Sequence, residues 1–102
     1  MVSISLCMIV RNEEKVLGRC LACVQGFADE IIIVDTGSTD RTKEIAFSFT
    51  DKVYDFKWKD DFAAARNFAF SKGTGDYLFW LDADDVVRQE ERRKLMDLKR
   101  RL

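Results

Sequence analysis

Two unbroken apolar segments, separated by one amphipathic segment, constrain the fold of this chain more than any other feature. Residues 4–10 read ISLCMIV and residues 31–34 read IIIV, without the polar alternation of a strand that faces water on one side. Both are typical of strands covered on two faces. Between them, NEEKVLGRCLACVQG predicts a helix with Asn12 as N-cap, acidic residues in its first turn and Gly26 just past its end. The three segments predict a β-α-β unit.

The same alternation continues along the chain. Residues 39–49 predict a second helix, KVYDFKW an edge strand with Tyr54, Phe56 and Trp58 on one side, DDFAAARNFAFSKG a third helix and DYLFWL a fourth strand. This order predicts an α/β fold, a Rossmann-like, doubly wound, mostly parallel sheet of about four strands with flanking helices. We expect residues 1–87 to form this domain and residues 88–102 a basic C-terminal helix or tail.

Composition excludes several classes of protein. The net charge of −1 leaves no overall basic footprint for nucleic acid. No apolar run approaches the roughly 18 residues that span a bilayer, and the N-terminus lacks the basic region and cleavage site of a signal peptide. We therefore expect a cytoplasmic protein without an integral membrane segment, whose three cysteines are reduced thiols.

Cys20 and Cys23 form a C-x-x-C pair that could suggest a metal or redox site. The chain contains no histidine, and a second pair of zinc ligands is missing. The pair also lies within a helical apolar stripe, which favours buried packing. The stripe consists of Val16, Leu17, Cys20, Leu21, Val24 and Phe27.

Polar clusters follow three of the predicted strands, at residues 11–13, 35–40 and 82–85. Ligands of doubly wound sheets bind outside the carboxyl ends of the strands. Neither usual glycine-rich phosphate loop is present, and the carboxylates of Asp82, Asp84 and Asp85 would repel a bare phosphate by roughly 4 kcal/mol per pair of charges at about 4 Å. Oxygen ligands suit Mn²⁺ or Mg²⁺, so this edge predicts a metal-bridged diphosphate.

Four motifs, in this order and spacing, carry a resemblance to a known family. They are ISLCMIVRNEE, EIIIVDTGSTDRT, DFAAARN and YLFWLDADD, and together they resemble the nucleotide-binding half of the family 2 glycosyltransferases, which have the GT-A fold. The resemblance covers about residues 3–85. It implies binding of a nucleotide-sugar, usually a UDP-sugar, through a divalent metal. The motif sequences are most similar to those of a branch of this family in which helical repeats often follow the transferase domain.

The resemblance also implies roles for residues near the diphosphate. Arg66 would support the base or the diphosphate, Asp82 would face the ribose or the metal, and Asp84 would ligate the metal. For Arg66 the alternative is a surface ion pair with Asp60 or Asp61. For the two motif aspartates the alternative is a solvated loop.

Three further residues are implied around the base. Asp35 would contact the base or ribose, with a cap of its own turn as the alternative. Glu13 would lie near the base, although a favourable charge in a first helical turn is the stronger interpretation. The family more often has an aromatic residue at Arg11 and a second acid at Thr36, so Arg11 is a nucleotide-site candidate that also suits a solvent-facing strand end.

Two other functions stay open on the sequence. FWLDADDVV also fits the pattern of haloacid-dehalogenase-like phosphatases, in which the first aspartate is the nucleophile, but that motif normally opens its domain. A non-catalytic nucleotide-binding module is the other alternative, because the family's general base and acceptor pocket follow the D-x-D motif. We therefore expect a donor-binding half that is incomplete as an enzyme.

The predicted fourth strand would lie at an edge of the sheet. An uncovered edge is a site for pairing with another chain. We therefore expect either the basic tail or a second copy to cover it, and the second possibility predicts a homodimer.

Overall fold

The structure, a computed structural model, describes residues 3–58, 61–81 and 89–101. Strands and helices alternate along these ranges, as predicted. The strands are β1 (Ile4–Val10), β2 (Glu30–Asp35), β3 (Val53–Asp55) and β4 (Tyr77–Trp80), and the helices are α1 (Leu17–Val24), α2 (Thr42–Phe47), α3 (Phe62–Lys72) and α4 (Gln89–Arg101). The predicted boundary between residues 87 and 88 falls outside the described residues.

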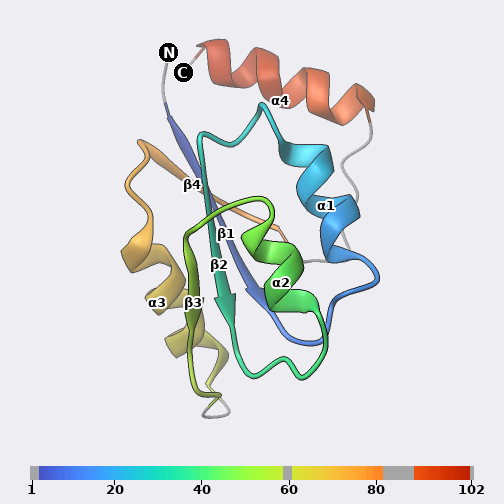
Figure 1. Cartoon of the computed structure of the whole chain (residues 1–102). Coiled ribbons are helices and arrows are strands. Elements are labelled where there is room, and N and C mark those ends of the chain that lie inside the picture. The colour runs from blue at the N-terminus through green and yellow to red at the C-terminus, as the bar shows by residue number, and fades with distance from the viewer. Residues whose placement is uncertain (1–2, 59–60, 82–88, 102) are drawn as a thin grey trace.

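The four strands form one parallel sheet in the order β3-β2-β1-β4. Val10, the last residue of β1, is opposite Asp35, which in turn is opposite Asp55 of β3. Strands β1, β2 and β3 therefore end together at one edge of the sheet, at the bottom of Figure 1, which we call the carboxyl edge, whereas β4 ends at Trp80, opposite Cys7 of β1. The α/β fold and the edge position of β3 are confirmed.

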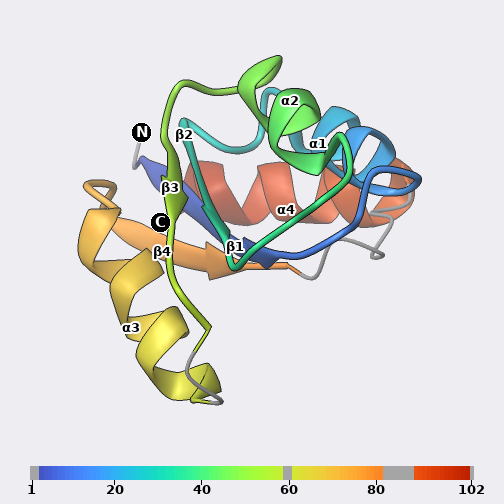
Figure 2. The ribbon, with the colours of Figure 1, turned by 60° about the horizontal axis from the view of Figure 1, so that its bottom comes forward.

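Helices cover both faces of the sheet, which explains the unbroken apolar strands. Helices α1 and α2 lie on one face and α3 on the other (Figure 2). Along β1, Leu6, Met8 and Val10 pack in the core under α1 and α2. Cys7 lies in the opposite core with Ala69 of α3. Each strand therefore needs apolar side chains on two sides.

Helix α1 begins later than predicted. It starts at Leu17, with Val16 at the N-cap and no acidic residue in its first turn. Asn12 is therefore not the N-cap. It has a φ of 53°, and its side-chain oxygen accepts a hydrogen bond from the backbone of Thr39 at 2.8 Å. The predicted end is confirmed, because Gly26 follows the helix with a φ of 87°.

The apolar stripe of α1 packs as predicted. Its central residues are buried, and none of the three cysteines is in a disulfide. Burial raises the pKa of the Cys7 thiol to about 11, and the negative charge of Glu30 adds to this effect. Of the C-x-x-C pair, Cys20 is therefore buried in the packing of this helix, whereas Cys23 is half-buried. The buried members are Leu17, Cys20, Leu21 and Val24.

Helix α4 lies at the opposite edge of the sheet, where the strands begin (Figure 1). We call this the amino edge. Lys99 is 3% exposed, donates a hydrogen bond to the backbone oxygen of Phe27 at 3.0 Å and pairs with Asp29 at 2.8 Å. Lys99 therefore anchors the basic tail to the rest of the domain.

No helix within the described ranges combines the length and apolar content needed to cross a membrane. Coverage of the free side of β4, and with it the homodimer, stays a prediction.

Candidate functional site

Two adjacent hollows open at the carboxyl edge. The first, of about 310 Å³, we call the Asp35 hollow. The second, of about 340 Å³, we call the Arg11 hollow. Thr36 and Trp58 belong to both. The Asp35 hollow is lined by Asp35, Thr36, Gly37, Asp55, Phe56, Lys57 and Trp58, and the Arg11 hollow by Ile9, Val10, Arg11, Glu13, Thr36, Trp58 and Phe62.

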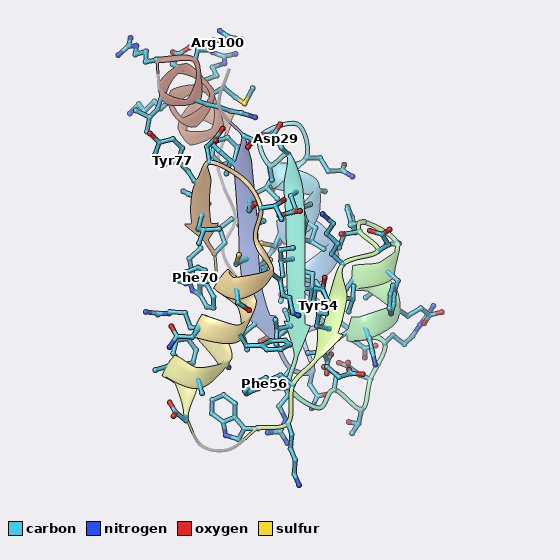
Figure 3. All side chains as sticks on the ribbon, turned by 90° about the vertical axis from the view of Figure 1, so that its left-hand side faces the viewer. Asp29, Tyr54, Phe56, Phe70, Tyr77 and Arg100 are labelled. Carbon is cyan, nitrogen blue, oxygen red and sulfur yellow. The ribbon has the colours of Figure 1, made fainter. Side chains whose placement is uncertain are left out.

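Figure 3 shows how this region is separated from the helical anchor. Phe56 marks the carboxyl edge, and Asp29 and Tyr77 mark the amino edge at the other end of the molecule. The hollows therefore lie where the sheet topology predicts a ligand.

Asp35 ends β2 and is 3% exposed. Its Oδ1 accepts hydrogen bonds from the backbone N–H groups of Gly37 and Ser38, at 2.8 and 2.7 Å. Gly37 takes a φ of 120°, a conformation that favours glycine. Oδ2 is buried and has no hydrogen-bond partner in the described part of the chain. One oxygen therefore caps the turn, as the alternative interpretation predicted, and the other is left as an acceptor.

An unpaired buried carboxylate oxygen is unusual in a folded protein. The large majority of buried polar side-chain atoms have a partner, and leaving one without costs roughly 1–3 kcal/mol or more. A group that bears this cost at the rim of a hollow is a candidate for contact with a ligand that carries an N–H or O–H donor.

The loop after β1 is joined to the loop after β2 by reciprocal hydrogen bonds. The backbone N–H of Asn12 donates to Ser38 Oγ at 2.9 Å, and Asn12 Oδ1 accepts from Thr39. The backbone N–H of Glu13 donates to Thr42 Oγ1 at 2.7 Å. These polar residues hold the two loops together, and Glu13 is one of the residues that line the Arg11 hollow. Glu13 precedes α1, so its predicted first-turn role is wrong.

Asp40 closes the same loop pair. Its Oδ1 accepts a hydrogen bond from the backbone N–H of Thr42 at 2.9 Å, and Oδ2 accepts from the backbone of Glu14 at 3.4 Å. The hydrogen bond from the Thr42 hydroxyl is the main cause that lowers the pKa of Asp40. Because this loop extends to Arg41, α2 starts at Thr42 and not at residue 39 as predicted.

Arg66 lies on α3 beside the Arg11 hollow. Its guanidinium carbon is 5.0 Å from the ring centre of Phe62 and 5.2 Å from that of Trp80, and cations favour the faces of such rings. Asp61 instead caps α3, its Oδ1 accepting from the backbone of Ala64 at 3.1 Å. Among the described residues Arg66 has no ion pair with Asp61, and Asp60 lies outside them.

The structure thus brings the base-side candidates together. Arg11 and Glu13 share one hollow, Asp35 lines the next, and Arg66 contacts Phe62, which lines the first. The predicted metal-side residues, Asp82 and Asp84, lie outside the described residues. Within residues 3–58, 61–81 and 89–101 there is no group of three or more His, Cys, Asp or Glu side chains that could hold a metal.

Sequence reasoning missed two aromatic residues of the site. Trp58 was predicted to continue the strand alternation of Tyr54 and Phe56, but β3 ends at Asp55, so Trp58 belongs to the loop that follows. Phe62 is 46% exposed although it opens an apolar helix segment. An exposed aromatic residue next to an unpaired acceptor indicates a site, but exposure is a property of the fold.

Comparisons with a family model and with known proteins agree on one family. The model of glycosyl transferase family 2 matches residues 5–101. A TPR repeat-containing protein of Synechococcus elongatus is 52% identical over 87 residues, which cover 85% of this chain and 22% of that protein. The prophage-derived glycosyltransferase SunS of Bacillus subtilis is 35% identical over 96 residues, covering 91% of this chain and 22% of SunS. The chain therefore spans about a fifth of the length of these relatives.

Two solved structures share the fold of this chain. Glucosyl-3-phosphoglycerate synthase from Mycobacterium tuberculosis, in complex with Mg²⁺ and UDP, aligns with a TM-score of 0.71 and 22% identity, covering 83% of this chain and 34% of that one. TarS of S. aureus aligns with a TM-score of 0.74 and 21% identity over 97% of this chain and 32% of TarS. At this identity the likeness establishes the fold.

Proposed function

The chain belongs to glycosyl transferase family 2, and from this premise we propose that its carboxyl edge binds the nucleotide of a UDP-sugar. The observation that carries the proposal is the buried, unpartnered Oδ2 of Asp35 at the rim of a hollow. Family membership favours this function over the haloacid-dehalogenase-like alternative. The solved complex of a fold neighbour with Mg²⁺ and UDP supports the choice of nucleotide.

The chemistry of Asp35 favours uracil among the pyrimidines. An ionised carboxylate oxygen only accepts hydrogen bonds. Uracil carries an N–H group at N3, whereas cytosine carries a lone pair there. A site that presents a buried acceptor leaves two acceptors opposed when cytosine is bound, and such mismatches discriminate strongly. The ribose hydroxyls are the other groups of the nucleotide that could donate a hydrogen bond to Oδ2.

The cations around the hollows suit the charge of a nucleoside diphosphate. Lys57 lines the Asp35 hollow and Arg11 lines the Arg11 hollow. Arg66 presents its guanidinium above Phe62. We assign the nucleotide to Arg11, Glu13, Asp35 and Arg66, with Asp82 as a further candidate outside the described residues.

A divalent cation, Mn²⁺ or Mg²⁺, belongs to this proposal through the sequence motif of Asp82 and Asp84. The described residues do not by themselves form a metal site. When bound, such an ion supplies charge stabilisation to a departing diphosphate. The support for it is the carboxylate chemistry of the motif and the metal complexes of the fold neighbour.

We further propose that this chain acts as the donor-binding part of a transferase, with weak or no sugar transfer of its own. Transfer needs an acceptor pocket and a group that takes the acceptor's proton. Relatives that carry the same region are several times longer. Turnover of a UDP-sugar onto an acceptor by the 102-residue chain alone would overturn this part of the proposal.

The test of nucleotide binding is a thermal-unfolding comparison of UDP, CDP, GDP and ADP, each with and without Mn²⁺. A ligand present at about 100 times its Kd adds about 2.7 kcal/mol to the free energy of unfolding. We expect stabilisation by UDP and none by CDP at equal concentration. Equal stabilisation by the two pyrimidine nucleotides would contradict the role given to Asp35.

A further inference from the structure

We propose that the amino edge of the sheet docks onto an anionic membrane surface. The contact is made by three exposed apolar side chains and two exposed cations, which we call the amino-edge patch. The patch lies at the edge of the sheet opposite the two hollows, so its function is independent of nucleotide binding. It consists of Tyr77, Leu78, Lys94, Leu98 and Arg101.

The apolar part of the patch comes from the start of β4 and from α4. Tyr77 and Leu78, the first two residues of β4, are 47% and 44% exposed, and Leu98 of α4 is 52% exposed. All three line one small hollow of about 170 Å³, so residues that are distant in sequence form one continuous surface. Contiguous apolar surface that faces solvent usually marks a site of interaction.

Two cations flank the exposed apolar residue of α4. Lys94 lies four positions before Leu98 and Arg101 three positions after it, and this spacing puts the three side chains on one face of the helix. Both cations are exposed, and neither has an ion pair with another side chain that the structure describes. Their charges are therefore available to an external anionic group.

Neighbouring charges are largely neutralised within the protein. Lys99 pairs with Asp29 at 2.8 Å, and Arg100 lies 3.6 Å from Asp97. Asp76, just before β4, adds one exposed negative charge. The two unpaired cations of the patch outnumber this acid, so the surface around the apolar residues keeps an excess of positive charge.

The distribution of charge over the whole chain would orient the molecule. Helix α4 contains six basic and three acidic residues, whereas the net charge of the chain is −1, so the rest of the domain is negative. An anionic surface attracts the end with α4 and repels the remainder. Figure 3 shows Arg100 and Tyr77 at this end and Phe56 at the other. In this orientation the hollows face away from the membrane and stay open to a soluble nucleotide.

The composition of the patch suits a bilayer better than a folded protein partner. Tyrosine and leucine enter the headgroup region of a membrane, while lysine and arginine reach anionic headgroups through their flexible aliphatic stems. A bilayer needs no matching shape. A specific protein partner buries about 800 Å² on each side, and the hollow between the apolar residues is only about 170 Å³.

Vesicle co-sedimentation of the whole chain tests the proposal. The protein is mixed with vesicles of phosphatidylcholine alone, or of an equal mixture of phosphatidylcholine and phosphatidylglycerol, at low and at high salt. We expect binding to the anionic vesicles and not to the neutral ones, and we expect it to weaken as salt screens the charges. Calorimetric titration with soluble polyglutamate presents negative charge without a bilayer.

Lys94→Glu combined with Arg101→Glu should weaken binding to the anionic vesicles at least about twentyfold, since each cation near such a surface contributes about fivefold. Lys15→Glu combined with Arg19→Glu is the matched control. Both residues are exposed near the start of α1, and the control reaches the same net charge but should change binding little. Leu98→Ser tests the apolar part and should weaken binding about fivefold.

Absence of binding to the anionic vesicles at low salt would overturn the proposal. Equal losses in the two double variants would show that net charge, and not the amino-edge patch, determines binding. Binding to polyglutamate without binding to vesicles would also overturn the proposal, and it would indicate an acidic protein segment as the partner. UDP titration in solution tests the nucleotide site separately, so failure of one proposal leaves the other standing.

Discussion

At the amino edge of the sheet the partly buried carboxylate of Glu30 has donors for both of its oxygens, whereas at the carboxyl edge the buried carboxylate of Asp35 has donors for only one. Glu30 Oε1 accepts from Ser5 Oγ at 2.7 Å and from the backbone of Thr74 at 2.8 Å. Oε2 accepts from Thr74 Oγ1 at 2.9 Å and from Lys52. Glu30 and Asp35 are the first and last residues of the same strand, β2.

The two carboxylates therefore have different surroundings: that of Glu30 connects several elements of the fold, and that of Asp35 keeps one oxygen unpaired within the described part of the chain. Glu30 joins β1, β2 and the loops before β3 and β4, so its hydrogen bonds hold the sheet together. Asp35 uses one oxygen to shape its turn, and its other oxygen has no hydrogen-bond partner among the described residues. Substitutions at the two carboxylates should therefore affect different properties of the protein.

The largest effect is expected at the ligand side. Asp35→Asn can keep the oxygen that accepts from Gly37 and Ser38, but it turns the free oxygen into an N–H₂ donor. UDP affinity should fall about a hundredfold, since hydrogen bonds to charged groups contribute roughly 1.5–3 kcal/mol, and CDP affinity should rise. Calorimetric titration of both nucleotides measures the change. An equal loss for UDP and CDP, with an unchanged melting temperature, would contradict the account.

Glu30→Gln should show the opposite pattern. One oxygen becomes a donor facing Ser5, Thr74 and Lys52, which are donors themselves, so the free energy of unfolding should fall by about 2 kcal/mol. Urea denaturation gives this value, and UDP affinity of the folded protein should stay within about twofold. Stability equal to that of the wild-type protein would show that the amino-edge network is not what holds the strands.

The pH dependence of stability tests whether the charge of Glu30 contributes to folding. Burial alone would raise the pKa of Glu30, but hydrogen bonds from Lys52, Thr74 and Ser5 together lower it to about 2. A lowered folded-state pKa means that the stabilisation is complete above the unfolded-state pKa, near 4.5, and is lost as pH falls toward about 2.

Urea denaturation of wild-type protein and Glu30→Gln across this range tests the linkage. The difference in unfolding free energy should be constant above about pH 5 and shrink below it. A difference that persists unchanged to pH 2.5 would mean that the charge of Glu30 does not matter for folding.

The smallest effect is expected for the helical anchor. Lys99→Met keeps the aliphatic stem in the core but removes the ion pair with Asp29 and the hydrogen bond to Phe27. The hydrogen bond from Lys99 lowers the pKa of Asp29, but Asp29 is 46% exposed, so solvent screening limits the loss to about 1 kcal/mol. Hydrogen exchange should become faster in α4 while β1 and β2 stay protected, and uniform acceleration would contradict a local anchor.

The strands and their order of connection could be predicted because burial on two faces leaves a direct mark on composition. Residues 4–10 and 31–34 are apolar for this reason, and β1 and β2 include them in full. The fold class followed from the alternation of such runs with helical segments. This part of the structure depends on local sequence and on one general rule of packing.

The loops could not be predicted in the same way, because their hydrogen bonds join residues that are distant in sequence. Asn12 fits an N-cap by pattern, but its carboxamide is used by Thr39 on another loop. Trp58 fits strand alternation, but β3 ends three residues earlier, at Asp55. Lys99 belongs to the predicted basic tail, but its contacts with Asp29 and Phe27 join residues that are about 70 positions apart in the sequence.

The sequence predicted that polar residues, Asp35 among them, would gather at the carboxyl edge, where the two hollows lie, while the role of Asp35 toward a nucleotide stays a prediction. The position of this site at the end of a buried strand followed from topology. That one oxygen would cap the turn and the other remain free depends on atomic geometry, which no residue pattern contains. The roles of Arg11, Glu13 and Arg66 toward a nucleotide stay predictions, as do those of Asp82 and Asp84 toward a metal.

The central claim is tested most directly by a binding cycle between Asp35 and N3 of the base. UDP and 3-methyluridine 5′-diphosphate, which lacks the N3–H, are each titrated into wild-type protein and Asp35→Asn, and the four affinities give the coupling between the two groups. We predict that N3 methylation weakens binding to wild-type protein about a hundredfold and hardly affects the variant. An equal effect of methylation in both proteins, or none in either, would contradict the assignment of the free oxygen to the base.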